Sequence, residues 1–176
     1  MKNLITLILV AFITVSCASF GEHPHSIEKA KDIGTLIDLK RYGPLTFAGQ
    51  PDIKSLKSLK DQNYELVINL RGKNEFKKFD EEKIVKESGL DYFQVPFFTK
   101  DKRISRKAIQ DIHKIVRDNH NKKIFIHCSS GNRAAAWLGA HLNLDHGVDI
   151  ERSITVAKGV GMTKEKMEKK LREFLQ

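Results

Sequence analysis

Cysteine is almost absent from this sequence, because Cys17 and Cys128 are the only two among 176 residues. Neither has a cysteine or histidine at the spacing of a metal-binding finger, and the seven histidines show no paired ligand spacing. We therefore expect no metal site and no cofactor. If Cys17 is lost or modified near the N-terminus, Cys128 is left without a partner for an internal disulfide.

The sequence also lacks a basic run interleaved with aromatic residues, although its formal net charge is +9. A positive charge favours anionic ligands and surfaces. The lysines are scattered over helix-like segments, however, so we expect no nucleic-acid partner. The charge therefore favours an anionic substrate, and we expect the protein to be a monomer.

No apolar run reaches the roughly 20 residues that a membrane-spanning helix needs. Residues 4–15 are apolar, follow Lys2 and precede a cluster of small residues, which is the pattern of an export signal. Residues 15–18, Val-Ser-Cys-Ala, resemble a bacterial lipobox that would make Cys17 the lipid-carrying first residue. Thr14 stands where that motif usually has leucine, so ordinary signal cleavage nearby is the alternative. We expect a signal peptide over residues 1–17, a tether over 18–34 and one catalytic domain over 35–176, exported to the periplasm or anchored to a membrane.

Strand-like and helix-like patterns alternate through the expected domain. Short apolar segments predict strands at 45–48, 65–70, 92–95 and 124–127, and the last is apolar enough to be covered on both faces. Apolar residues at helical spacing predict helices from 51, over 81–87, from Ser105, and over 133–144, 149–158 and 163–175. This alternation predicts a single compact α/β domain with a mostly parallel central sheet of about four to five strands flanked by helices.

The segment 124–137 carries the strongest chemical pattern, because Cys128 lies between a buried strand and the start of a helix. A lone cysteine in that place is most often an inert core residue. Here the backbone N–H groups of the following loop can form an anion-binding nest, and Arg133 adds a positive charge that favours a thiolate. We predict that Cys128 is a nucleophile and that Arg133 holds an anion. The expected binding loop consists of Ser129, Ser130, Gly131 and Asn132.

Ligands of open α/β sheets bind beyond the carboxyl ends of the strands, so the loops after residues 70 and 95 should meet the Cys128 loop. Asp101 is the only carboxylate in the second of these loops and is the candidate general acid; the alternative is a solvated loop residue. Arg71, followed by Glu75, either helps to bind the anion or forms an ion pair that fixes its loop. His127 is expected to orient the loop from the core rather than act as acid or base.

Four segments occur in an order that resembles bacterial dual-specificity/tyrosine-phosphatase-like proteins, in particular the phosphatase-like domain of beta-lactamase-hydrolase-like proteins. They are Phe-Ala-Gly-Gln-Pro (47–51), Val-Ile-Asn-Leu-Arg (67–71) with Glu75, Gly-Leu-Asp-Tyr (89–92) with Val-Pro (95–96), and His-Cys-Ser-Ser-Gly-Asn-Arg (127–133). The resemblance covers about residues 45–161. It implies the cysteine-phosphatase fold and a phosphocysteine intermediate on Cys128, with Arg133 holding the phosphoryl group.

The chain departs from that pattern at two points. Four residues separate Cys128 from Arg133 where tyrosine phosphatases have five, and four is the usual number in rhodanese-type sulfurtransferases, whose cysteine carries a persulfide. Ala134 also stands where phosphatases usually have a serine or threonine that helps to expel the cysteine. Three hypotheses follow: an exported cysteine-dependent phosphatase-like hydrolase of phosphomonoesters, a sulfurtransferase with a persulfide on Cys128, and a non-catalytic anion-binding module.

Overall fold

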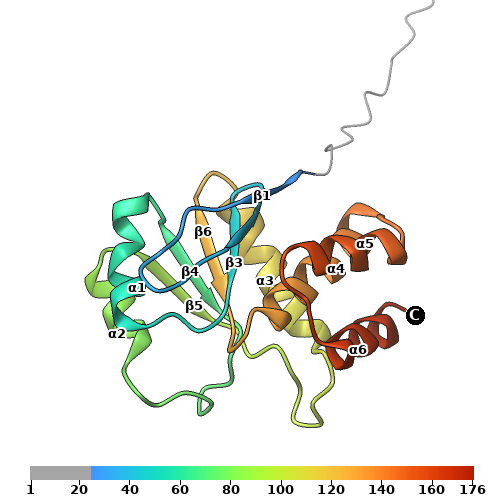
Figure 1. Cartoon of the computed structure of the whole chain (residues 1–176). Helices are drawn as coiled ribbons and strands as arrows, with labels where there is room; N and C mark the ends of the chain where they lie inside the picture. The colour runs from blue at the N-terminus through green and yellow to red at the C-terminus, as the bar shows by residue number, and fades with distance from the viewer. Residues whose placement is uncertain (1–24) are drawn as a thin grey trace, which may run out of the picture.

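The computed structural model describes residues 25–176, and the expected signal peptide with Cys17 lies outside them. A six-stranded sheet forms the centre, in the order β1-β2-β3-β6-β4-β5 (Figure 1). Strands β3, β6, β4 and β5 are parallel, whereas β1 and β2 add an antiparallel extension beside β3. The strands are β1 (Ile27–Lys29), β2 (Lys40–Tyr42), β3 (Leu45–Ala48), β4 (Leu66–Asn69), β5 (Asp91–Gln94) and β6 (Ile124–His127).

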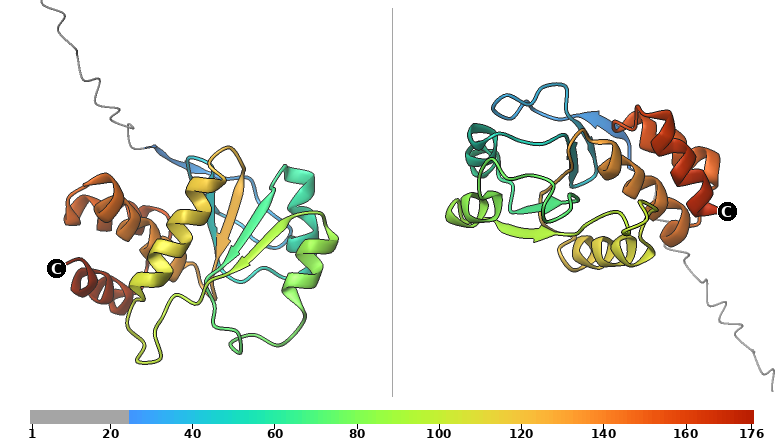
Figure 2. Two further views of the ribbon diagram at one scale, coloured as in Figure 1. Left: turned by 180° about the vertical axis from the view of Figure 1, so that it is seen from behind. Right: turned by 90° about the horizontal axis from the view of Figure 1, so that it is seen from below.

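Helices cover both faces of the sheet, with α1 and α2 on one side and α3 to α6 on the other (Figures 1 and 2). Ser105 accepts a hydrogen bond from the N–H of Ala108, so the expected N-terminal cap of α3 is confirmed. None of these helices is both long and apolar enough to cross a bilayer, as far as residues 25–176 are concerned. Their bounds are α1 (Ile53–Ser58), the 3-10 turn η1 (Lys60–Gln62), α2 (Glu81–Glu87), α3 (Arg106–Asp118), α4 (Asn132–His146), α5 (Ile150–Gly159) and α6 (Glu165–Leu175).

Alternation along β6 explains why its first three residues, 124–126, are all apolar. Ile124 and Ile126 pack into the core beneath α3 to α6, while Phe125 packs into a second core beneath α1 and α2. Successive side chains of a strand point to opposite faces, so both faces of β6 are buried. The predicted α/β fold with a mostly parallel sheet is therefore confirmed, and β1 and β2 bring the strand number to six.

The expected tether over residues 18–34 is wrong for its described part. Ile27–Lys29 forms β1 and pairs with β2, and Ile33 is fully buried beside Leu56 and Leu59. The packed domain therefore begins before residue 35. The sequence does not indicate this strand, because β1 is only three residues long and is exposed along its length.

Candidate active site

Cys128 directly follows the central strand of the parallel sheet. His127 lies in register with Ala48 of β3 on one side and with Asn69 of β4 on the other. The Cys128 side chain is 1% exposed and is in no disulfide within residues 25–176. It lies at the base of a pocket of about 450 Å³. The pocket is lined by Glu75, Phe98, Lys102, Cys128, Ser129, Ser130, Asn132, Arg133, Lys164, Lys166, Met167 and Lys170.

Gly131 turns the chain from the loop into α4. Its φ of +80° lies in the left-handed region that favours glycine. As the N-cap of α4 it offers no side-chain oxygen to the first turn. The first N–H groups of an α-helix have no intrahelical acceptor and carry the positive end of the helix dipole. The loop therefore presents unpaired donors where an anion above Cys128 would lie.

Arg133 occupies the second position of α4 and is 7% exposed. Its Nη1 donates to Glu75 Oε2 (2.8 Å) and to the Leu70 carbonyl (3.3 Å), and its Nη2 donates to Glu75 Oε1 (2.5 Å) and Ser129 Oγ (3.0 Å). Burial alone would lower the pKa of Arg133, but its hydrogen bonds to Glu75, the charge of that carboxylate and the nearby Cys128 sulfur raise it. The guanidinium is therefore a fixed positive charge in the wall of the pocket.

Arg71 fixes the loop after β4 rather than lining the pocket. Its guanidinium donates to Gln50 Oε1 (2.5 Å) and to the Glu75 carbonyl (2.6 Å), and it lies 4.7 Å from the centre of the Phe76 ring. These contacts match the loop-fixing alternative for Arg71. The arginine holds Glu75 in place, and Glu75 in turn pairs with Arg133.

A buried polar network lies behind the loop and was not predicted from the sequence. Glu81, the first residue of α2, accepts hydrogen bonds from Asn69 (3.1 Å) and Gln50 (2.6 Å) and lies 2.8 Å from His127 Nε2. Burial alone would raise the pKa of Glu81, but the His127 and Gln50 contacts outweigh it and hold the pKa below its usual value. The network fixes His127, and with it the backbone that leads into Cys128.

The sequence signals for this network were Asn69 and His127, two polar residues in otherwise apolar runs. Glu81 is next to Glu82 at the start of the same helix, and nothing in the sequence distinguishes the two. Glu81 is nevertheless 6% exposed, whereas the side chain of Glu82 is 54% exposed. The difference depends on how α2 lies on the sheet.

Asn132 links the loop to the segment between α5 and α6. Its Oδ1 accepts hydrogen bonds from the backbone N–H groups of Thr163 (2.9 Å) and Lys164 (2.8 Å). Its side-chain amide donates to the Ser130 carbonyl at 3.3 Å. Asn132 thus lines the pocket and also positions the lysine-bearing start of α6 at the pocket rim.

Asp101 lies in the loop between β5 and α3, which with the loop after β4 reaches beyond the carboxyl ends of the strands (Figure 1). Its side chain is 76% exposed and lies 3.7 Å from Arg103. Phe98 and Lys102 of the same loop line the pocket, but Asp101 does not. Its role as general acid stays a prediction that needs this loop to turn inward.

Comparison with solved structures finds the same fold in proteins described as phosphatases. No protein-family model matches the chain, and no curated protein matches its sequence. Among solved structures, a DUF442 protein from Shewanella putrefaciens, named as a candidate phosphatase, is 17% identical with a TM-score of 0.59, covering 86% of this chain and 87% of its own.

Two further structures show the same similarity. P. aeruginosa TpbA, as a cysteine-to-serine variant in complex with phosphotyrosine, is 14% identical with a TM-score of 0.64, covering 84% of this chain and 88% of its own. The core catalytic domain of the S. cerevisiae PP-IP phosphatase SIW14, in complex with citrate, is 16% identical with a TM-score of 0.59, covering 74% and 80%. The chain therefore has the fold of the dual-specificity and tyrosine phosphatases.

Proposed function

We propose that the chain is a cysteine-dependent phosphatase that hydrolyses phosphomonoesters through a phosphocysteine on Cys128. The observation that carries this proposal is that buried Cys128, in the loop that leads into the N-terminus of α4, lines one pocket together with Arg133. Helix dipole, loop amides and guanidinium all favour negative charge at one point. The phosphatase fold supports the same reaction.

In the proposed reaction, the Cys128 thiolate attacks phosphorus, and an S–P bond forms as the bond to the leaving oxygen breaks. The leaving oxygen takes a proton from an acid, for which Asp101 is the candidate. Water then attacks the phosphocysteine and returns a proton to that acid, while the S–P bond breaks, inorganic phosphate leaves and the thiolate is restored. Arg133 and the loop amides stabilise the negative charge on the transferring group in both steps.

Four lysines at the rim of the pocket support a substrate with more than one negative charge. Lys102 comes from the loop before α3, and Lys164, Lys166 and Lys170 come from α6 and its start. Lys170 Nζ donates to the Lys102 carbonyl (2.7 Å), which ties the two sides of the rim together. We propose that a second anionic group of the substrate lies against this rim.

The test is phosphate release from an aryl phosphate by wild-type protein and by Cys128→Ser. We expect Cys128→Ser to lose turnover and Cys17→Ser, which changes the only other cysteine, to keep it. Arg133→Lys retains the charge but not the two-point donor geometry, and removal of such a group typically lowers the rate by about 10²–10³-fold. Equal rates for wild type and Cys128→Ser would reject the nucleophile, and tight phosphate binding without turnover would favour the anion-binding module.

Sulfur transfer is a second candidate because only four residues separate Cys128 from Arg133. A shorter loop offers fewer amides to an anion and suits a smaller group. Incubation with thiosulfate followed by intact-mass measurement should then show one added sulfur on Cys128. An unchanged mass, under conditions that load a known rhodanese, would contradict this candidate.

We also propose export, with lipidation at Cys17, on the basis of residues 2–19 alone. The intact mass of the protein isolated from membranes should correspond to a chain that begins at Cys17 and carries acyl groups. A mass that begins elsewhere, without lipid, would instead indicate ordinary signal cleavage.

A further inference from the structure

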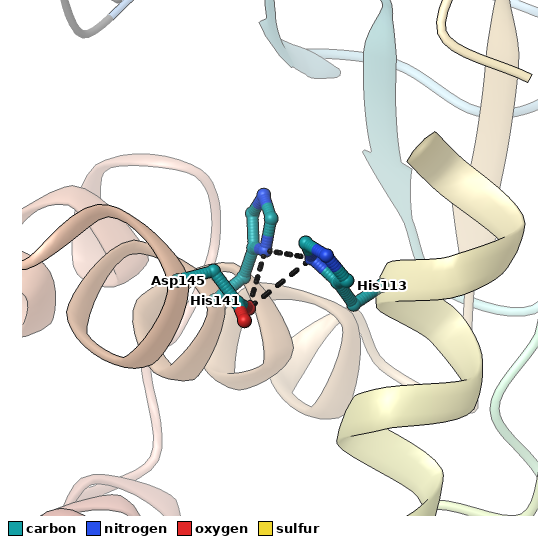
Figure 3. Close-up of side chains that lie close together, drawn as sticks. All are labelled: His113, His141 and Asp145. Carbon is teal, nitrogen blue, oxygen red and sulfur yellow. Dashed lines mark hydrogen bonds and ion pairs between the residues drawn. The ribbon is translucent and has the colours of Figure 1, made fainter. Parts of the chain in front are cut away.

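A cluster of possible metal ligands lies between α3 and α4, away from the Cys128 pocket. His113 projects from α3, and His141 and Asp145 project from successive turns of α4 (Figure 3). The Nδ1 atoms of the two histidines are 3.0 Å apart. Asp145 Oδ2 lies 3.2 Å from His113 Nδ1 and 2.9 Å from His141 Nδ1. Three electron-pair donors thus converge on one point from two helices.

The separations between these three ligand atoms are close to those around a small divalent transition metal ion. Zinc bonds to histidine nitrogen and carboxylate oxygen are about 2.0–2.2 Å long, so two ligands of a tetrahedral site lie about 3.3 Å apart. The three separations need to widen by only a few tenths of an ångström. A metal ion uses all three lone pairs at once.

The surroundings of His141 fix the ring in the orientation that a ligand needs. Trp137 stacks on it, with centroids 5.1 Å apart and an interplanar angle of 9°. The other nitrogen, Nε2, lies 3.1 Å from His146 Nε2. A histidine bound to metal through Nδ1 carries its proton on Nε2, and such ligands almost always donate that proton to a neighbour.

The cluster is open enough to be loaded from solvent. The side chains of His113 and Asp145 are 26% and 29% exposed, and that of His141 is 12% exposed. We propose that His113, His141 and Asp145 bind one Zn²⁺ ion, with a fourth position left for water and with His146 as a positioning residue. Two imidazoles and one carboxylate suit zinc, copper or nickel better than magnesium or calcium.

The proposed ion joins α3 to the helix whose first turn carries Arg133. Histidine spacing along the sequence gave no sign of it, because His113 and His141 are 28 positions apart and meet only through helix packing. The site is independent of the proposed phosphatase reaction. Its role would be to hold the two helices together rather than to activate water at Cys128.

Zinc titration of full-length, chelator-treated protein tests the proposal. Calorimetry should show one Zn²⁺ per chain for wild type and a loss of that binding in His113→Gln and Asp145→Asn, two substitutions of similar shape at half-buried positions. His120→Gln is the matched control, because His120 lies just beyond α3 and, within residues 25–176, its ring contacts only the Arg117 carbonyl. His146→Gln should weaken binding by about 10–100-fold. Titration of Cys128→Ser shows whether the thiol contributes to the zinc bound by wild type.

Thermal unfolding gives a second readout. Zn²⁺ should raise the Tm of wild type and His120→Gln but not that of His113→Gln or Asp145→Asn, and Mg²⁺ should raise none of them. Absence of zinc binding by wild type would overturn the proposal and leave a hydrogen-bonded cluster only. Binding by His113→Gln and Asp145→Asn as tight as that of wild type would overturn it as well.

Discussion

Glu75 and Arg133 form a two-point ion pair in the wall of the pocket, with Nη1–Oε2 and Nη2–Oε1 distances of 2.8 and 2.5 Å. The Leu70 carbonyl and Ser129 Oγ accept from the same two nitrogens. The four terminal N–H groups of Arg133 therefore match four acceptors of the protein. A phosphoryl group that binds Arg133 at two points must displace at least one of them, and Glu75 is the acceptor that also repels it by charge.

We expect Glu75→Gln to bind inorganic phosphate several-fold more tightly than wild type. The arginine lowers the pKa of Glu75 through their hydrogen bond, so the carboxylate is charged at neutral pH and competes with the substrate for Arg133. The gain is limited because the Glu75 side chain is 39% exposed and water weakens the pair. Competitive inhibition by phosphate measures the change, with Glu87→Gln as a surface control. Weaker binding would mean that Glu75 orients Arg133 for the substrate.

We expect Asp101→Asn to slow turnover of alkyl phosphates more than that of aryl phosphates. Proton donation by a positioned acid typically contributes about 10²–10⁴-fold, and a good leaving group needs it least. The kcat for both substrate types measures the effect, with Asp111→Asn on α3 as the control. If Asp101→Asn lowers kcat by the same factor for both substrate types, Asp101 is a solvated loop residue and the acid lies elsewhere.

Substitutions of Asn132 should separate stability from binding. Asn132→Ala leaves the Thr163 and Lys164 N–H groups without their acceptor, which should lower the free energy of unfolding by about 1–3 kcal/mol. Asn132→Asp keeps the acceptor and should be more stable than Asn132→Ala, but its charge beside the loop should weaken phosphate binding. Urea unfolding and phosphate inhibition give the two quantities. Equal stability of the two variants would contradict the role of Oδ1.

Lys166→Ala should raise KM for a phosphomonoester with a second anionic group and leave kcat unchanged. Lys166 lines the pocket, whereas Lys169 on the same helix does not line it and pairs with Glu173, so Lys169→Ala is the matched control. The effect should shrink at high salt, since exposed charges are screened beyond about 10 Å at 0.1 M. If KM rises equally for substrates with and without the second anionic group, the rim lysines do not bind that group.

The buried Glu81 should make stability depend on pH in the acid range. Its pKa is lower in the folded chain than the reference value of 4.5, so the stabilisation is present above that value and is lost as the pH falls through the folded pKa. At pH 7, the free energy of unfolding of Glu81→Gln should be about 1–3 kcal/mol lower than that of wild type. This difference should become smaller as the pH falls below the reference pKa of 4.5. Urea unfolding from pH 7 to pH 3 tests this, with the exposed Glu82→Gln as control. A gap that does not change with pH would contradict the ionised state of Glu81.

The sequence predicted the parallel strands and the Cys128–Arg133 loop because both depend on local patterns. One apolar run stops before Arg71 and the other stops at His127, and Gly131 precedes a helix start, so local residues determine where the loops begin. The Gln50–Glu81–His127 network and the His113–His141 contact were not predictable in this way. They depend on how helices lie across the sheet, which neighbouring residues do not encode. The short β1 escaped detection because its residues are exposed and carry no alternation.

The central position of β6 has a consequence for the chemistry of the thiol. Both edges of this strand are hydrogen-bonded, to β3 and to β4, so it separates from its neighbours only when the whole domain opens. Peroxide or an alkylating agent must then enter through the mouth lined by Phe98 and the lysines, not through a fluctuation of the strand. The rate of chemical modification at this sulfur should report how far that mouth is occupied.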